Sequence, residues 1–416
     1  MLTNPEHDGI DAERPESDYS RPTKRDPRGM RTGYTTGTTA AAAAKAAVIL
    51  MLSGSAPEQV SVPLPGGRGY ATLKVHRSWP MVPEEGVRCS VVKDGGDDPD
   101  VTHGAEIIVG VWRLPDGIKG LHITGGPGVG TVTRPGTGIE VGDPAVTRVP
   151  RRMMADAVAE GLVECGWPPE TGVRARISVP DGEEIAKQTT NARLGVLGGI
   201  SILGSTGIVQ PFSTAAWRAS VHLAIDVAAT NGLDHLVLST GTRSEQYTRQ
   251  LLDLPDMAYV EAGIFSGPSM KRCVNKGIKR VAHVGMVGKF SKMAMGYFVT
   301  HVAGNQVDTG FLSQLAAQCG APPELQEEMR NAASGRHFQE LAQEHGVMEV
   351  FPLMCQLVCQ QAQRYLGQDS DADPSDTIIV DALCFDFEGN LLGAASTSAD
   401  GIPMRDPATV AADAAI

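Results

Sequence analysis

The residues best suited to acid–base chemistry stand together in one short segment, VVKDGGDDPDVTHG at Val91 to Gly104. Two adjacent glycines among like charges indicate a sharp turn in which carboxylates crowd together. Crowding raises at least one carboxyl pKa unless a cation or backbone amides compensate. The groups are therefore candidates for general-base catalysis or for a hard-cation site. They are four carboxylates and a nearby histidine: Asp94, Asp97, Asp98, Asp100 and His103.

A solvated acidic turn is an equally open interpretation, because charge runs usually face water. The D-x-D-x-D-G order of an EF-hand calcium loop does not fit this segment. Elsewhere, Cys355 and Cys359 stand four residues apart in an apolar helical run, FPLMCQLVCQQ. They are interpreted as core residues, because zinc needs four donors at recognisable spacing. No metal is assigned.

A second segment, NARLGVLGGISILGSTGIVQP at Asn191 to Pro211, places glycines among short apolar runs. Leu194–Leu197 and Ile200–Leu203 are too short for helices and are interpreted as buried strands. The loop 204–207 follows them and precedes a helix that starts near Ser213. Such loops commonly point amide N–H groups at an anion. A glycine-rich hairpin that only tightens packing is an equally open interpretation.

The alanine-rich run AAAAAKAA predicts a helix that ends near Leu52, with Thr38 or Thr39 as its cap. Its small side chains indicate close packing against a sheet. The threonines before it gather hydroxyls and amides at the helix start, where we expect ligand contact: Thr35, Thr36 and Thr38.

The remaining glycine-rich loops do not match a triphosphate site. Gly125–Thr131 lacks the lysine of a P-loop, and Gly285–Lys289 has the lysine but too few residues between its glycines, which disfavours kinase chemistry. Glu261 ends a predicted strand, where it can accept ribose hydroxyls or cap a turn. A dense basic region suits a carboxylate-rich substrate, although at least half of it is expected to be solvated. It comprises Lys271, Arg272, Lys276, Lys279, Arg280, Lys289 and Lys292.

The composition fits an α/β protein of two domains: 416 residues, 42% hydrophobic and 5% aromatic. The net charge of −12 disfavours nucleic acid or an anionic membrane as the main partner. No apolar run approaches the ~20 residues of a membrane span, and the start lacks a signal-peptide core, so a cytoplasmic location is expected. An odd count of seven cysteines favours reduced thiols.

The order of predicted elements gives the fold class, an α+β domain followed by an α/β domain. In the second domain, strand, loop and helix repeat in series, which predicts a mostly parallel sheet with flanking helices and ligands at the carboxyl ends of its strands. All the glycine-rich loops are expected on that edge. The predicted parts are a disordered extension at 1–28, the first domain at 29–188, the second at 189–395 and a mobile tail at 396–416.

Four blocks follow one another along the chain: RTGYTTGTTAAAAAKAA at Arg31 to Ala47, VVKDGGDDPDVTHG at Val91 to Gly104, GGPGVGTVTRPG at Gly125 to Gly136, and the Asn191 to Pro211 segment. In this order they resemble the CbiD family, the cobalt-precorrin-5B C1-methyltransferases of the anaerobic cobalamin pathway. Thr39 stands where the family is expected to show cysteine, which argues against a thiol role there.

This resemblance implies transfer of a methyl group from S-adenosylmethionine to C1 of a cobalt-containing polycarboxylate macrocycle, giving cobalt-precorrin-6A. It implies a first domain similar to the second domain of ribosomal protein S5. The expected proton acceptor is one of Asp94, Asp97 and His103. The cofactor is expected at the edge of the second domain, and the macrocycle between the domains. The cofactor set is Gly198, Gly199, Ser205, Thr206, Gly207, Gly241 and Glu261; the substrate set is Thr35, Thr36, Lys93 and Lys289.

Two other functions stay open at this point. A small-molecule kinase with an S5-like domain would bind ATP with magnesium. A non-catalytic corrinoid-binding protein would bind the tetrapyrrole but not S-adenosylmethionine. Calorimetry with S-adenosylhomocysteine separates all three. A homo-oligomer is also left open.

Overall fold

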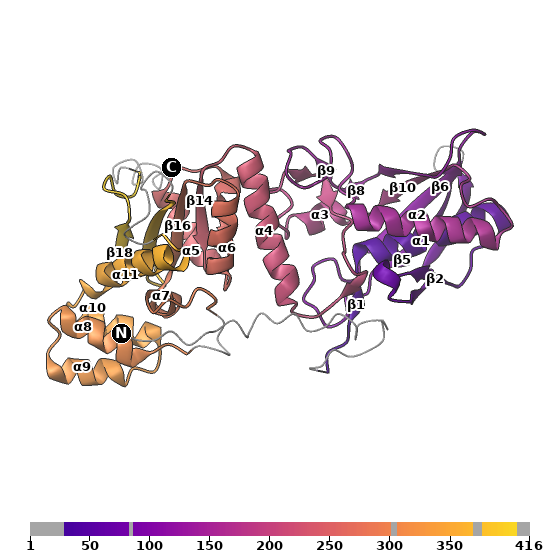
Figure 1. The fold of residues 1–416 in the computed structure, drawn as a ribbon. Coiled ribbons are helices and arrows are strands. Elements are labelled where there is room, and N and C mark those ends of the chain that lie inside the picture. The colour runs from indigo at the N-terminus through magenta and orange to yellow at the C-terminus, as the bar shows by residue number, and fades with distance from the viewer. Residues whose placement is uncertain (1–28, 83–85, 301–305, 369–376, 406–416) are drawn as a thin grey trace, which may run out of the picture. The chain divides into compact units, whose positions relative to one another are not determined.

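The computed structural model describes residues 29–82, 86–300, 306–368 and 377–405 (Figure 1). The predicted disordered extension at 1–28 lies outside these ranges. The chain has a mixed α/β fold and divides into two compact units, Met1–Ser213 and Thr214–Ile416. Each unit is described separately below.

The first unit is built around α1 (Thr36–Ser53), whose alanines are completely buried. These small side chains allow α2 (Arg148–Glu164) to run close beside it (Figure 1). Thr35 caps α1 by accepting a hydrogen bond from the Thr38 amide. The predicted cap, Thr38 or Thr39, is therefore wrong, because the helix starts one turn earlier. By length and composition α1 would also pass as a membrane span, but 78% of it is buried, as expected of a core helix.

A five-stranded sheet packs against α1 in the order β4-β5-β6-β10-β7. Its neighbouring strands are antiparallel except for β10 and β7, which are parallel. A separate hairpin of β2 and β3 also contacts α1. The bounds are β2 (Gln59–Pro63), η2 (Pro65–Gly67), β3 (Tyr70–Lys74), β4 (Arg77–Val82), β5 (Gly86–Val92), β6 (Glu106–Arg113), β7 (Leu121–Gly125), β10 (Val173–Ser178) and α3 (Gly182–Ala186).

The glycine-rich segment belongs to the first unit, so its assignment to the second domain is wrong. It forms two-residue strands that pair with strands far earlier in the chain, and not the two longer strands predicted from its apolar runs. Because these pairings bind residues 189–213 to the first unit, the division falls at Ser213 and not at 188. The pairs are β11 (Val196–Leu197) with β9 (Thr131–Val132), β12 (Gly199–Ile200) with β8 (Gly128–Val129), and β13 (Ile208–Val209) with β1 (Gly33–Tyr34).

The second unit contains the predicted mostly parallel sheet, in the order β15-β14-β16-β17-β18. The first four strands are parallel and β18 is antiparallel. Most apolar residues of the four parallel strands are buried, on both faces of the sheet, whereas Leu391 on the edge strand β18 is exposed. The bounds are β14 (His235–Ser239), β15 (Tyr259–Glu261), β16 (Arg280–Met286), β17 (Ile379–Phe385) and β18 (Leu391–Ser396).

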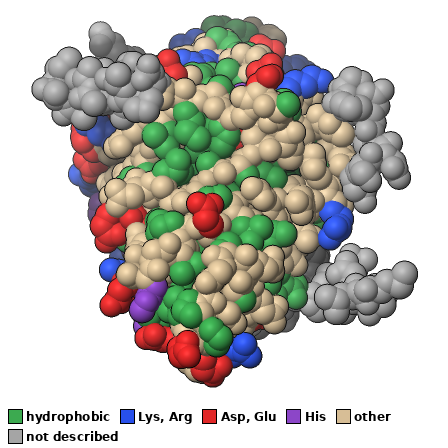
Figure 2. Space-filling model, turned by 90° about the vertical axis from the view of Figure 1, so that its left-hand side faces the viewer, with side chains coloured by type: hydrophobic (Ala, Val, Ile, Leu, Met, Phe, Trp, Pro, Cys, Tyr) green, Lys and Arg blue, Asp and Glu red, His purple; other side chains and the backbone are tan. Residues whose placement is uncertain are grey.

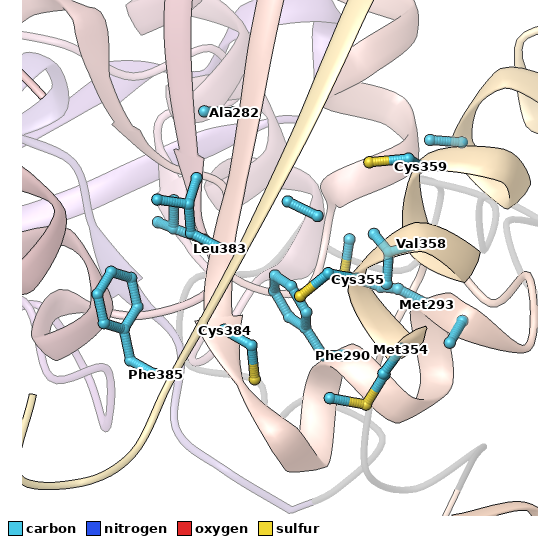
Figure 3. Packing of buried hydrophobic residues seen from close by; sticks show 14 of the residues in the cluster. Ala282, Phe290, Met293, Met354, Cys355, Val358, Cys359, Leu383, Cys384 and Phe385 are labelled. Carbon is cyan, nitrogen blue, oxygen red and sulfur yellow. The ribbon is translucent and has the colours of Figure 1, made fainter. Parts of the chain in front are cut away.

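Helices flank this sheet, and their apolar faces form one core with it (Figures 1 and 3). Cys355, Cys359 and Cys384 lie inside that core, as predicted for the first two, and burial raises the pKa of the Cys359 thiol to about 12. The bounds are α4 (Thr214–Thr230), α5 (Thr242–Leu251), η3 (Asp256–Ala258), α6 (Ser266–Asn275), α7 (Val287–Ala294), α8 (Thr309–Gln318), α9 (Pro323–Arg330), α10 (Gly335–Glu344) and α11 (Val350–Tyr365).

The prediction of a mobile tail from 396 is wrong for its described part. The Arg280 guanidinium donates to the Gly401 carbonyl, and the Arg405 amide donates to the Leu251 carbonyl at 2.8 Å. Arg405 also pairs with Asp253 at 2.6 Å. Residues 397–405 are therefore packed on the second unit; residues 406–416 lie outside the described ranges.

His283 on β16 is fully buried, and neither ring nitrogen has a hydrogen-bond partner among the described residues. Its ring packs against Phe298, with 6.2 Å between the ring centroids. Burial lowers the pKa of this imidazole from 6.5 to about 3. The folded unit therefore keeps His283 neutral.

We expect His283 to cost the second unit about 2 kcal/mol of stability between pH 7 and pH 5. Over this range the unfolded chain protonates the imidazole and the folded unit does not, so stability falls as the pH falls. His283→Leu should remove this part of the pH dependence. Hydrogen exchange of β14 and β16 amides, compared between the two proteins at both pH values, measures it.

The comparison with wild type is needed because burial also lowers the pKa of His222 and His235. An unchanged slope in His283→Leu would contradict the prediction.

Candidate functional site

The acidic turn is held by two basic residues. The Arg31 guanidinium pairs with the Asp94 carboxylate, and the Arg31 backbone amide donates to Asp97 Oδ2 at 2.7 Å. Lys93, only 1% exposed, pairs through Nζ with Asp100 Oδ2 at 2.7 Å. The predicted crowding is therefore compensated by cations. Arg31 holds the pKa of Asp94 below its usual range, and Lys93 lowers the pKa of Asp100 against the opposing effect of burial.

The three predicted proton acceptors lie close together but differ in the hydrogen bonds and ion pairs that their side chains already make. His103 Nδ1 lies 3.8 Å from Asp94 Oδ1 and accepts the Gly95 amide at 3.0 Å. A neutral imidazole arranged in this way keeps its proton on Nε2 and has no free lone pair. Asp97 Oδ1, in contrast, accepts no hydrogen bond within the described part of the chain, and its ion pair there with Arg31 Nε is 3.9 Å long. Of the three, Asp97 has the carboxylate oxygen with the weakest contacts, and its role as proton acceptor stays a prediction.

The turn is fixed to β1 by backbone contacts that only glycine permits. A Cβ on Gly33 would overlap the backbone of Gly95 and Gly96. The two segments exchange hydrogen bonds, from Tyr34 N to Asp94 O at 2.7 Å and from Asp97 N to Arg31 O at 2.9 Å. The Arg31 to Ala47 and Val91 to Gly104 blocks thus contact each other in the fold, which their spacing in the sequence did not indicate.

The threonines at the start of α1 bind the glycine-rich segment. Thr35 and Thr36 are buried, and the Thr36 hydroxyl accepts the Leu203 amide at 2.9 Å. The Gly37 amide donates to the Leu203 carbonyl, and the Thr38 hydroxyl donates to the Gly207 carbonyl. The backbone of the glycine-rich segment is therefore already hydrogen-bonded to Thr36, Gly37 and Thr38 at the start of α1. Contact of Thr35, Thr36 and Lys93 with a substrate stays a prediction.

The glycine-rich segment is closely packed in some places and open to solvent in others, and its ligand-binding purpose stays a prediction. A Cβ on Gly199 would overlap the Gly128 backbone, and one on Gly207 would approach the Leu64 side chain, so these glycines permit packing. Gly198 and Ser205 are exposed and Thr206 is half-buried, so part of the segment is open to solvent. None of these residues belongs to the sheet edge of the second unit on which we expected all the glycine-rich loops.

That sheet edge brings together the other predicted residues. β15 lies on one side of β14 and β16 on the other, so the connections that leave β14 and β16 diverge, which is where open α/β sheets bind ligands. Gly241 follows β14, with no atom within 4 Å of the position of a Cβ. Glu261 ends β15 and accepts a long hydrogen bond from Thr242 at 3.4 Å. Lys289, on α7 and not in the predicted loop, donates to the Thr240 carbonyl.

The basic region is not one patch, because partners neutralise much of it. Arg272 and Lys276 pair with Asp226, and Arg280 pairs with the buried Asp381 at 2.6 Å. Lys271 lies over the ring of Tyr365. On the face of the second unit shown in Figure 2, acidic side chains gather along the margins and basic ones are scattered.

Family models match most of the chain. The model described as CbiD matches residues 23–211, and the model described as the CbiD C-terminal domain matches residues 299–396. A curated relative from Salinispora tropica is 44% identical over 386 residues, which are 92% of this chain and 96% of the relative. The chain belongs to the CbiD family. The resemblance read from the four sequence blocks is confirmed.

Other CbiD relatives agree. A Geobacillus sp. protein is 44% identical over 88% of this chain and 96% of its own, and a Thermus thermophilus protein is 43% identical over 83% and 91%. All three are named cobalt-precorrin-5B C(1)-methyltransferase. The crystal structure of cobalamin biosynthesis protein (cbiD) from Archaeoglobus fulgidus is 26% identical, covers 76% of this chain and 85% of that chain, and aligns with a TM-score of 0.35.

Sequence reasoning missed two residues of this CbiD chain that the geometry brings to the candidate sites. Arg31 stands in the first block but was not linked to the carboxylates 63 residues away. Thr242 follows Gly241 and reaches Glu261 only because β14 and β15 are adjacent and parallel. The signal available for Arg31 was a cation two residues before Gly33, at the start of the block that contains the threonines.

Proposed function

We propose that this chain methylates C1 of cobalt-precorrin-5B with S-adenosylmethionine, giving cobalt-precorrin-6A in anaerobic cobalamin biosynthesis. The observation that carries the proposal is the match to relatives of that name over 92% of this chain and 96% of the relative. A similarity that spans nearly the whole of both chains leaves little room for a different set of domains. A likeness of the first unit to the second domain of ribosomal protein S5 is part of the same proposal.

The residues at the sheet edge of the second unit fit the methyl donor. Glu261 and Thr242 supply a carboxylate and a hydroxyl suited to ribose hydroxyls, and the open space beside Gly241 admits a ligand close to the backbone. We assign the donor to this edge, with Gly241 and Glu261 as its predicted contacts and Lys289 beside them. When bound, S-adenosylmethionine supplies an electrophilic methyl group on a sulfonium. Gly198, Gly199, Ser205, Thr206 and Gly207 lie in the first unit and are proposed as contacts of either ligand.

The chain's own task in methyl transfer is to align the reactants, exclude water and accept a proton. The acidic turn of the first unit is proposed for the proton, with Asp97 Oδ1 as its acceptor. Arg31 positions that carboxylate through its backbone amide. His103 is proposed as a hydrogen-bond donor through Nε2, because Gly95 occupies Nδ1.

The proposal is tested by incubating the purified chain with cobalt-precorrin-5B and S-adenosylmethionine without oxygen. The expected result is a tetrapyrrole heavier by one methylene unit together with an equal amount of S-adenosylhomocysteine. Isotopic label in the methyl group of the donor, located by NMR, identifies the methylated carbon. Label at another carbon, or no transfer from a folded protein, would overturn the proposal. Binding of ATP with magnesium would favour the kinase alternative.

A further inference from the structure

Lys292 is a largely buried lysine with no counter-charge among the residues that the structure describes. It lies on α7 and is 4% exposed. Within the described ranges its ammonium group has no hydrogen bond or ion pair, whereas Arg272, Lys276 and Arg280 of the same basic region all have carboxylate partners. The stem of Lys292 is enclosed while its ammonium group keeps contact with solvent, so the structure leaves a partly desolvated charge that an anion from elsewhere would stabilise.

The position of Lys292 indicates where that anion binds. Lys289 precedes it by three residues, so both side chains lie on one face of α7. Lys289 reaches the Thr240 carbonyl, at the carboxyl end of β14, and lies close enough to Glu261 to feel its charge. Burial lowers the pKa of both lysines, and the charge of Lys292 lowers that of Lys289 further. The two ammonium groups therefore both contribute positive potential to the sheet edge near Thr240 and Glu261.

We infer that Lys292 binds a carboxylate group of a ligand at this edge. The inference rests on the proposed function, which supplies two carboxylates of the same chemistry. One is the amino-acid carboxylate of the methyl donor, and the other is an acidic side chain of the macrocycle. Either would form a charge-assisted hydrogen bond with the ammonium group and remove the unpaired charge.

The test replaces Lys292 with methionine, which keeps the length and the apolar stem of the side chain. Calorimetry of the full chain with S-adenosylhomocysteine is compared with 5′-methylthioadenosine, which lacks the carboxylate. If the donor carboxylate binds Lys292, Lys292→Met should weaken S-adenosylhomocysteine binding about 10-fold or more and leave 5′-methylthioadenosine unchanged. If a macrocycle carboxylate binds there, both affinities stay unchanged and the KM for cobalt-precorrin-5B rises about 10-fold instead.

Three further measurements separate ligand binding from a structural role. Lys292→Arg should restore a large part of the lost affinity. Lys292→Met should raise the Tm, because it removes a partly desolvated charge without taking a partner from any neighbour, whereas loss of a structural contact would lower it. Lys119→Met, at an exposed lysine of the first unit outside the basic region, should change neither ligand affinity nor KM.

A folded Lys292→Met protein with wild-type affinity for both nucleosides and wild-type KM would overturn the inference. Failure of the proposed function looks different. In that case the unmodified chain itself neither binds S-adenosylhomocysteine nor methylates the macrocycle.

Discussion

Replacing Asp97 with asparagine is expected to slow methyl transfer by about 100-fold or more while the first unit stays folded. Asparagine has the same size and keeps an oxygen that can accept the Arg31 amide, but it cannot take up a proton. The Arg31 guanidinium hydrogen-bonds to Asp94 but lies 3.9 Å from Asp97 Oδ1, and the His103 lone pair is occupied by the Gly95 amide, so neither Asp94 nor His103 is well placed to substitute. Single-turnover measurements with saturating donor and macrocycle report the change.

The control is Asp116→Asn, at a carboxylate that is 91% exposed and pairs only with Arg113 among the described residues. Turnover and Tm of this variant should equal those of the wild type. Calorimetry should give Asp97→Asn an unchanged affinity for S-adenosylhomocysteine, because the donor is assigned to the second unit. Unchanged turnover in Asp97→Asn would remove this carboxylate from the mechanism.

The sheet of the second unit could be predicted because its strands are continuous apolar runs bounded by turn residues. The apolar runs at Leu236–Ser239 and Arg280–Val284, which predict two of these strands from the sequence, correspond closely to β14 and β16. Such runs are buried on both faces of a parallel sheet, and that burial leaves a local signal. The helix that carries Lys289 was missed because its first turn contains Gly288, whose tolerance inside a helix depends on tertiary packing. Gly335, at the start of α10, packs against this turn, because a Cβ on Gly335 would lie 2.9 Å from the Cα of Gly288.

The glycine-rich segment could not be placed in the same way. Its strands have two residues each, too few to show any periodicity, and each pairs with a segment more than 60 residues away. The choice of partner depends on close backbone approach, such as Gly199 against Gly128, which composition does not encode. The acidic turn is a similar case. Its carboxylates could be identified from the sequence, but Arg31, the cation that lowers the pKa of Asp94, lies just before β1 and far away in the sequence.

Replacing Gly33 with alanine is expected to cost the first unit about 3 kcal/mol and to abolish methyl transfer. A Cβ at this position meets the backbone of Gly95 and Gly96, which cannot rotate away as a side chain can. β1 and the acidic turn must then separate, which breaks the hydrogen bond from Tyr34 to Asp94. Thermal unfolding should show a Tm lower by roughly 6–12 °C for a unit of this size.

Gly288→Ala is the matched control, because a Cβ there makes only an ordinary contact of 3.7 Å with Val307. Alanine also favours a helix over glycine, so the Tm of this variant should stay level or rise slightly. The pair of variants separates steric exclusion from a general effect of adding a methyl group. If Gly33→Ala unfolds at the wild-type temperature, the close contact between β1 and the turn is not required for the fold. If it then also keeps wild-type turnover, the turn does not need β1 to position Asp97.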